Sequence, residues 1–319
     1  MFKAGGRVMA QPNYRMATKH GRLFKNIQRY PQLYWMILPV IAYFIIFHYV
    51  PMYGIQIAFR DFYPGISITA AKWVGFENFE RFFRTYMFPR VMINTLRISL
   101  MGLILGFPMP VLLALMLNYL PKHGLRRVLQ MTSYAPYFIS AISMAGILTI
   151  FLSERGIVNV LLRTLSGKSI DFLGKGSLFA WIYVIGNIWK NMGWNSIIYI
   201  AALAGIDPSL YESARIDGAT KAQTILYIDI PLIMPTMTIL LILNCGNLLS
   251  VGWEQILQMQ NTLNLSHSEI ISTYTYKIGL VSGEYSYSAA IGMFNSVINL
   301  IILMVVNTVS RKVGETSLW

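Results

Sequence analysis

The chain has 319 residues, of which 55% are hydrophobic and only 12% are charged, and its mean hydropathy is +0.52. A soluble globular domain carries about 25% charged residues, so this composition excludes that class and predicts a membrane protein. The net charge of +13 is common among nucleic-acid-binding proteins, but the basic residues are distributed as in a membrane protein, and we expect no nucleic-acid partner.

Six apolar segments are long enough to cross a lipid bilayer, which takes about 20 apolar residues in a helix. They span residues 32–50, 92–118, 128–152, 177–204, 232–257 and 286–309. No sizeable segment is left for a soluble domain. The predicted fold is therefore an all-α integral membrane protein with six transmembrane helices.

Basic residues gather on one side of this predicted membrane. Residues 1–30 hold seven Lys and Arg and no acid, and further basic residues follow the second span, in 205–231 and in 310–319. Loops on the other side hold ten cations and seven acids. The positive-inside rule then predicts that both termini and segment 205–231 are cytoplasmic, with the basic arm also meeting anionic lipid.

Several features exclude other functions. The first apolar span is long enough to cross and no cleavage site follows it, so we interpret it as a retained span and not as a signal peptide. Cys245 is the only cysteine, which excludes an internal disulfide. No nucleotide-binding Gly-x-x-x-x-Gly-Lys-Ser/Thr motif, catalytic triad or metal-ligand cluster is evident, so we expect neither enzymatic activity nor a cofactor.

Segment 31–89 combines the first span with an outer loop. Within this loop Phe76, Phe79, Phe82 and Phe83 fall on one helical face, which predicts an amphipathic helix. In the second span, Pro108 and Pro110 interrupt the helical hydrogen-bond ladder, so we expect either a hinge or a static bend there.

A polar segment between the fourth and fifth spans predicts a docking site for a partner. Asp207 is a good helix N-cap and Pro208 suits the first helical position. About two helical turns follow, and Gly218 either ends them or lets another backbone come close. Pro231 and Pro235 fit the start of the next span, where a missing amide costs little.

The same segment carries a family signature, from Glu212-Ser-Ala214 through Gly218 and Ala219 to Ile228 and Pro231. It resembles the EAA loop of the membrane subunits of binding-protein-dependent ABC importers, with Ser213 in place of the first Ala and Ile230 in place of Leu. The resemblance implies that this loop couples the chain to ATP-binding subunits. The implied coupling residues are Tyr211, Glu212, Ser213, Ala214, Arg215, Asp217, Gly218 and Ala219.

The resemblance extends over nearly the whole chain, including the Asn94-Thr-Leu96 opening of the second span and the Phe76-Glu-Asn-Phe79 segment. It is closest to carbohydrate permeases of the maltose/alginate type, in the branch that imports oligosaccharides from polysaccharide utilisation. This implies a type I importer permease with a core at 90–309, an EAA loop at 205–231 and a tail at 310–319. The implied partners in the bacterial cytoplasmic membrane are a second similar permease, two ATP-binding subunits and an external solute-binding protein.

Amide side chains within the spans indicate where substrate could pass. Asn187, Asn191 and Trp194 share one face of the fourth span, and Asn244 and Asn247 lie three residues apart in the fifth. Amides in hydrocarbon are costly unless they pair or face a cavity, so these residues either bond between helices or line a path for sugars. In maltose-type permeases the sugar contacts come from these two spans, which favours the path. Lys190 flanks the same face and is expected to snorkel, pair with an acid or meet an anionic sugar.

Asn295 and Asn299 on the sixth span are expected to pack between helices. The C-terminal tail either docks on the ATP-binding subunits, with Leu318 and Trp319 as an apolar anchor, or is disordered. A secondary transporter would need ionisable residues in mid-membrane, and the spans offer few, namely Lys190 and, near an outer end, Glu254. Within the ABC class, a permease for peptides or amino acids remains an alternative to one for oligosaccharides.

Overall fold

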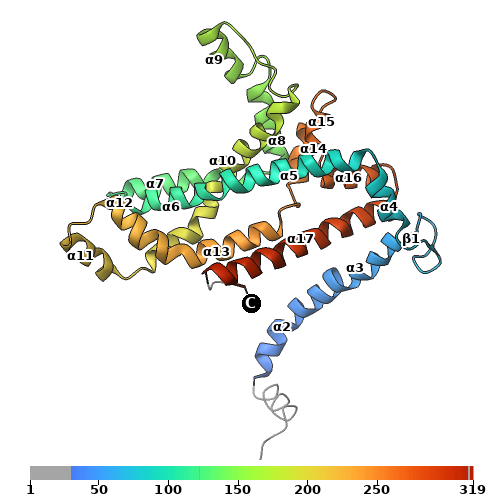
Figure 1. Cartoon of the computed structure of the whole chain (residues 1–319), viewed down its shortest axis with the longest axis horizontal. Coiled ribbons are helices and arrows are strands. Elements are labelled where there is room, and N and C mark those ends of the chain that lie inside the picture. Colours follow the sequence, from blue (N-terminus) through green and yellow to red (C-terminus); the bar gives the residue numbers. More distant parts are fainter. Residues whose placement is uncertain (1–29, 122, 315–316, 319) are drawn as a thin grey trace, which may run out of the picture. The chain divides into compact units, whose positions relative to one another are not determined.

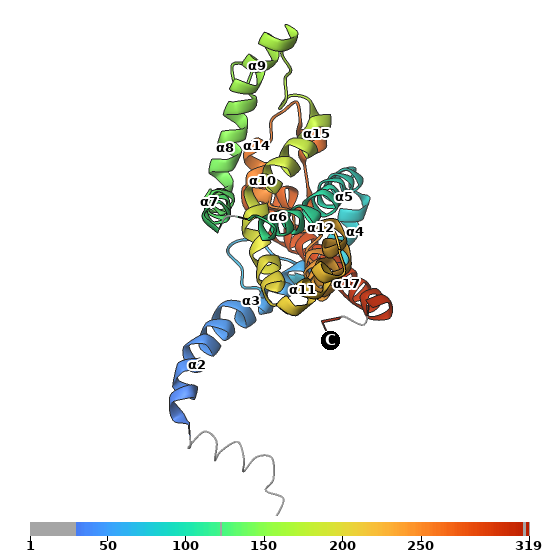
Figure 2. The same cartoon turned by 90° about the vertical axis from the view of Figure 1, so that its left-hand side faces the viewer.

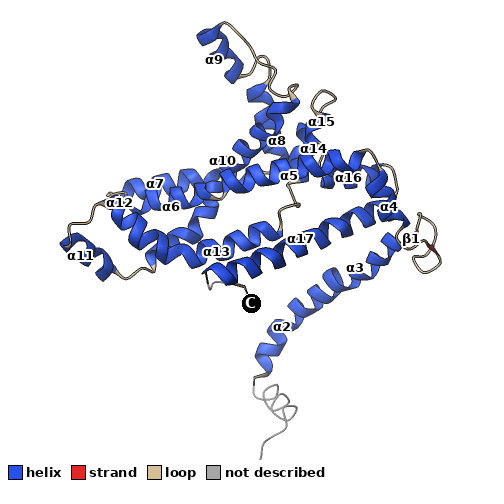
Figure 3. Ribbon diagram, viewed as in Figure 1, coloured by secondary structure: helices blue, strands red, loops and turns tan. Residues whose placement is uncertain are grey.

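The computed structural model describes residues 30–121, 123–314, 317 and 318. It divides the chain into two compact units, Met1–Ile55 and Gln56–Trp319. The basic arm predicted at residues 1–30 lies outside the described residues except for Tyr30. Helices account for almost all of the regular structure (Figure 3), so the prediction of an all-α fold is confirmed.

The described part of the first unit is one helical stretch. It consists of α2 (Pro31–Phe44), a π-helical turn (Ile45–Tyr49) and α3 (Val50–Met52), and it runs into a 3₁₀ turn, Tyr53–Phe59. None of the side chains of α2 or α3 is buried within the chain. Such an apolar surface is stable only against lipid or another protein.

The second unit begins with a small antiparallel pair, β1 (Arg60–Asp61) and β2 (Lys72–Trp73), in which Arg60 lies opposite Trp73. The expected amphipathic helix follows as α4 (Glu77–Arg84), with Phe82 buried. The remaining helices are α5 (Met87–Gly106), α6 (Pro108–Asn118), α7 (His123–Tyr134), α8 (Ala141–Leu152), α9 (Ile157–Ser166), α10 (Gly176–Ala204), α11 (Pro208–Ile216), α12 (Lys221–Thr224), α13 (Ile230–Gly246), α14 (Trp253–Met259), α15 (Leu265–Ser268), α16 (Ile271–Tyr276) and α17 (Tyr285–Gly314).

Helix α10 organises the core of the second unit by packing against α5, α6 and α13. One buried cluster surrounds Phe179 and Tyr183, and another surrounds Tyr199 and Leu203. Helices α13 and α17 lie side by side (Figure 1), while α8 and α9 extend from the bundle (Figure 2).

Of the described residues, five helical stretches are long and apolar enough to cross a membrane: Pro31–Phe59, Met87–Asn118, Ala141–Ser166, Lys221–Gly246 and Tyr285–Lys312. The 29-residue helix α10, predicted as the fourth span, is not among them. Its three asparagines and Lys190 dilute its apolar character. The six-span count and the cytoplasmic termini therefore stay predictions.

Two predicted spans are wrong as single helices. Residues 128–152 form α7, a 3₁₀ turn (Ala135–Phe138) and α8, because Pro136 has no amide to continue the α-helical ladder. Ser140 then caps α8 by accepting a hydrogen bond from the Ser143 amide at 3.0 Å. Residues 232–257 are interrupted as well, since α13 ends at Gly246 and α14 begins only at Trp253.

Two further boundaries differ from the sequence prediction. The helical stretch that leads into α13 starts at Lys221, so Pro231 lies inside it, two residues after the end of a π-helical turn (Ile225–Asp229). A π-helical turn relocates the backbone bonds that a proline cannot make. At the other end, α17 reaches Gly314, beyond the predicted 309. The Leu318 amide folds back onto the Asn307 side chain at 2.8 Å, and Trp319 lies outside the described residues.

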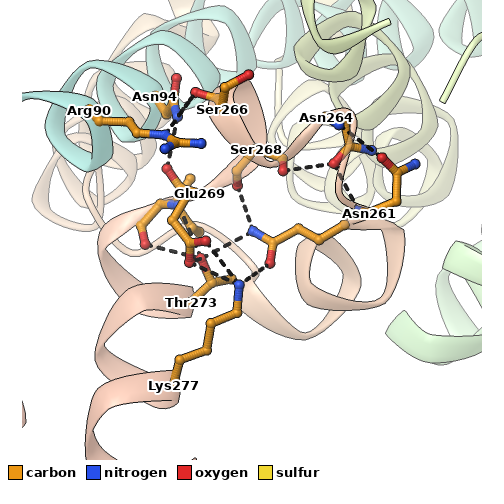
Figure 4. Close-up of polar contacts among 11 residues, drawn as sticks. Arg90, Asn94, Asn261, Asn264, Ser266, Ser268, Glu269, Thr273 and Lys277 are labelled. Carbon is orange, nitrogen blue, oxygen red and sulfur yellow. Dashed lines mark hydrogen bonds and ion pairs between the residues drawn. The ribbon is translucent and has the colours of Figure 1, made fainter. Parts of the chain in front are cut away.

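A buried polar network fixes the segment between α13 and α17 onto α5 (Figure 4). The Asn94 amide donates to the carbonyls of Ser266 and Glu269 at 3.1 and 2.9 Å. The Glu269 side chain is 3% exposed and pairs with Lys277 at 2.9 Å, and Lys277 also donates to Gln260 at 2.8 Å. This network explains structurally why an asparagine opens the second span.

Candidate functional site

A cavity of about 270 Å³ lies among α5, α6, α10 and the end of α13. Asparagine side chains dominate its polar lining, and none of the described residues that line it is charged. The asparagines are Asn187, Asn191, Asn195, Asn244 and Asn247. Four of these are residues predicted from the sequence to line the path.

The cavity is built where α13 breaks. After Gly246 the backbone leaves the helix, and Leu248, Ser250, Val251 and Gly252 join the cavity wall. Non-helical backbone at membrane depth is tolerated only where protein or a cavity satisfies it. The break therefore needs hydrogen-bond partners from another element.

Asn299 supplies those partners. Its side-chain oxygen accepts the Leu249 amide at 3.0 Å, and its Nδ2 donates to the Ser250 hydroxyl at 3.0 Å. Asn299 is 8% exposed and lies halfway along α17, so the break is at the depth of the middle of that helix. The sequence predicted that Asn299 packs between helices, and in the structure it does so by capping the interrupted helix α13.

Most of the cavity amides expose acceptor oxygens. Asn191 donates its Nδ2 to Asn187, Asn244 donates to the Leu240 carbonyl at 2.8 Å, and Asn247 donates to the Leu243 carbonyl at 3.2 Å. The side-chain oxygens of Asn191, Asn244 and Asn247 accept no hydrogen bond from any described residue. The arrangement presents neutral acceptors to a ligand that carries donors, such as hydroxyl groups.

Two of the predicted residues do not line this cavity. Trp194 stacks on Tyr137 with ring centroids 4.5 Å apart and an interplanar angle of 6°. Lys190 is half-buried and likewise outside the lining. The cavity follows positions i, i+4 and i+8 of α10, which are Asn187, Asn191 and Asn195, and Trp194 is rotated about 100° from Asn195. Extending the helical face shared by Asn187 and Asn191 by one more turn would have identified Asn195.

A second candidate site is the exposed helix α11 and its flanks. The Asp207 side chain accepts the Ser209 amide at 2.9 Å, and this bond lowers the pKa of the Asp207 carboxyl. Gly218 has a φ of +75° with open space around its missing Cβ, so it ends the helix and does not serve close packing. Of the two roles considered for Gly218, the structure selects the first.

The predicted coupling residues divide between the two faces of this loop. Glu212, Ser213, Arg215, Asp217 and Gly218 are exposed, while Tyr211, Ala214 and Ala219 are half-buried. Glu212 and Arg215 form no ion pair with any described residue. Ile216 is 87% exposed, which adds an apolar contact point to the charged face.

Comparison with known proteins identifies the family. Residues 106–315 match the family described as binding-protein-dependent transport system inner membrane component. The chain belongs to this family. It is therefore a transport subunit of an ABC importer in the plasma membrane and not an enzyme, and the predicted resemblance is confirmed.

Several relatives of this permease cover almost its full length. It is 38% identical to protein LplB of Bacillus subtilis (strain 168), over 92% of each chain. It is 37% identical to the polygalacturonan/rhamnogalacturonan transport system permease protein YteP of the same strain, over 94% of each chain. A chain in the crystal structure of a bacterial ABC transporter that imports the acidic polysaccharide alginate is 41% identical, with a TM-score of 0.84, over 92% of this permease and 99% of that chain.

A second crystal structure shows the alginate transporter in complex with an alginate pentasaccharide-bound periplasmic protein. One of its chains is 40% identical to this permease with a TM-score of 0.86, and the match covers 93% of this permease and 100% of that chain. This level of agreement confirms the type I importer fold.

Proposed function

We propose that this permease carries an oligosaccharide across the membrane and that the amide-lined cavity forms part of the path. The observation that carries the proposal is the set of neutral amide oxygens around the break in α13. Sugar hydroxyls are donors that match such acceptors. The names of the relatives, which refer to polygalacturonan, rhamnogalacturonan and alginate, favour the same substrate class.

The neutral lining disfavours the alternatives. Coupling to protons or sodium uses acidic, basic or histidine side chains near the substrate, and the described residues of the cavity wall include no Asp, Glu, His, Lys or Arg. Amino acids and peptides carry an ammonium group that would need an acidic partner, and no described residue of the cavity wall is an Asp or a Glu. A hydroxyl-rich solute needs none.

In the proposed complex this chain pairs with a second, homologous permease and two ATP-binding subunits, and an external solute-binding protein delivers the sugar. The chain crosses the membrane six times, with α10 as the fourth span and both termini in the cytoplasm. The exposed face of α11, with Glu212, Arg215 and Ile216, then contacts the ATP-binding subunits. ATP is bound by those subunits, and this chain needs no cofactor of its own.

The test is uptake of a labelled oligosaccharide into proteoliposomes that contain the whole complex and its binding protein. We expect uptake to require ATP, and Asn191→Leu or Asn244→Leu to reduce kcat/KM about three- to tenfold, which is the worth of one neutral hydrogen bond. Asn295→Ala, on α17 outside the cavity, is the control. Uptake driven by an ion gradient without ATP, or wild-type kinetics in both cavity variants, would overturn the proposal.

A further inference from the structure

Asp229 places a carboxylate in the interior of the second unit, at the end of the π-helical turn that leads into α13. The residue is 0% exposed and forms no ion pair with any described residue. A buried carboxylate is costly unless hydrogen bonds compensate for the lost water. The groups that donate hydrogen bonds to the Asp229 carboxylate are therefore held firmly in place by it.

Two tyrosine hydroxyls meet this carboxylate, one on each oxygen. Tyr119 donates to Oδ2 at 2.7 Å and Tyr211 donates to Oδ1 at 2.6 Å. Burial, the hydrogen bond to Asp229 and its negative charge all raise the pKa of both phenols, so both stay protonated and continue to donate. Hydrogen bonds to an ionised acceptor are about twice as strong as neutral ones.

These bonds join three elements that are far apart in the chain. Tyr119 directly follows α6, Tyr211 lies on α11, and Asp229 leads into α13. Figure 1 shows α11 at the end of the bundle where α6 ends and α12 begins. The opposite face of α11 is exposed, so its side chains otherwise remain available to a partner.

Two of the joined elements also build the cavity. Helix α6 contributes Pro110 to its wall, and α13 contributes Asn244. A helix transmits displacement along its axis because its backbone bonds are internal. Movement of α11 can therefore reach the cavity through α6 and α13, provided that the contact at Asp229 holds.

We propose that Asp229, Tyr119 and Tyr211 form a clasp that makes α11 move as one body with the ends of α6 and α13. The three are positioning residues, and the proposal rests on the proposed function in that the force comes from ATP-binding subunits docked on α11. The clasp transmits that force to the cavity. Loss of either hydroxyl leaves ATP hydrolysis possible but separates it from transport.

The test measures oligosaccharide transported per ATP hydrolysed in the reconstituted complex. We expect the ratio to fall about fivefold or more in Tyr211→Phe and in Tyr119→Phe, and more than tenfold in the double variant, since each charge-assisted bond is worth about a factor of ten. Asp229→Asn keeps the shape and loses the charge, and we expect an intermediate ratio. Tyr63→Phe, an exposed tyrosine between β1 and β2, is the matched control and leaves the ratio unchanged.

Hydrogen–deuterium exchange of the assembled complex tests the clasp without reference to any substrate. Tyr119 is not on α11, yet Tyr119→Phe should accelerate exchange in Pro208–Ile216, because the Asp229 carboxylate links the Tyr119 hydroxyl to the Tyr211 hydroxyl. Unaltered exchange there, or an unaltered transport ratio at normal assembly, overturns the clasp. Failure of the wild-type complex to take up sugar contradicts the proposed function, while the exchange result still decides the clasp.

Discussion

Replacement of Asn299 by alanine tests whether one side chain holds the break in α13. The change removes the acceptor of the buried Leu249 amide and the donor to the Ser250 hydroxyl, both at 3.0 Å. An orphaned buried donor costs about 1–3 kcal/mol, and the hydroxyl can rotate toward other acceptors, so we expect a loss of about 2 kcal/mol. For a chain of this size that lowers the melting temperature by about 3 °C.

The assay is thermal unfolding of the purified complex. Samples are heated to a series of temperatures, and size-exclusion chromatography measures how much folded permease remains at each. Asn295→Ala is a matched control on the same helix, four residues earlier, because the Asn295 side-chain oxygen is buried and accepts no hydrogen bond from any described residue. We expect the control to melt within about 1 °C of the wild type. Equal melting temperatures for the two variants would refute the capping role of Asn299.

The remaining predictions concern the coupling loop and α10. Glu212→Lys and Gly218→Asp should leave the permease in the membrane and abolish stimulation of ATP hydrolysis by the loaded binding protein; wild-type stimulation in either would contradict the docking role. Trp194→Ala removes the stack on Tyr137 and should cost about 1 kcal/mol of stability, measured by thermal unfolding; an unchanged melting temperature with a raised KM for sugar would instead indicate direct contact with substrate. Lys190→Gln should lower uptake of acidic relative to neutral oligosaccharides if this lysine meets an anionic sugar, and an unchanged ratio would end that prediction.

The features predicted correctly from the sequence are those set by local chemistry. Asp207, Pro208 and Gly218 define the start and end of α11 within a few residues, because caps and turns depend on neighbouring backbone groups. The position of Asn187 and Asn191 on one helical face follows from helical periodicity alone. Both could be recognised without knowledge of any distant contact.

The features that were missed depend on residues far apart in the chain. The apolar run continues through Leu248 and Leu249, so hydropathy gives no signal that α13 ends at Gly246. The group that makes the break stable is Asn299, fifty residues later. Asp229 likewise is one more acid in a polar loop until the fold brings Tyr119 to it, so its role becomes visible only in three dimensions.

The most direct test of the account is a cryo-electron microscopy structure of the whole complex, trapped with ATP bound and with an oligosaccharide in transit. The account predicts sugar hydroxyls within hydrogen-bond distance of Asn191, Asn244 and Asn247, beside the break in α13. A sugar that contacts only the second permease, or that passes the membrane away from these amides, would contradict it.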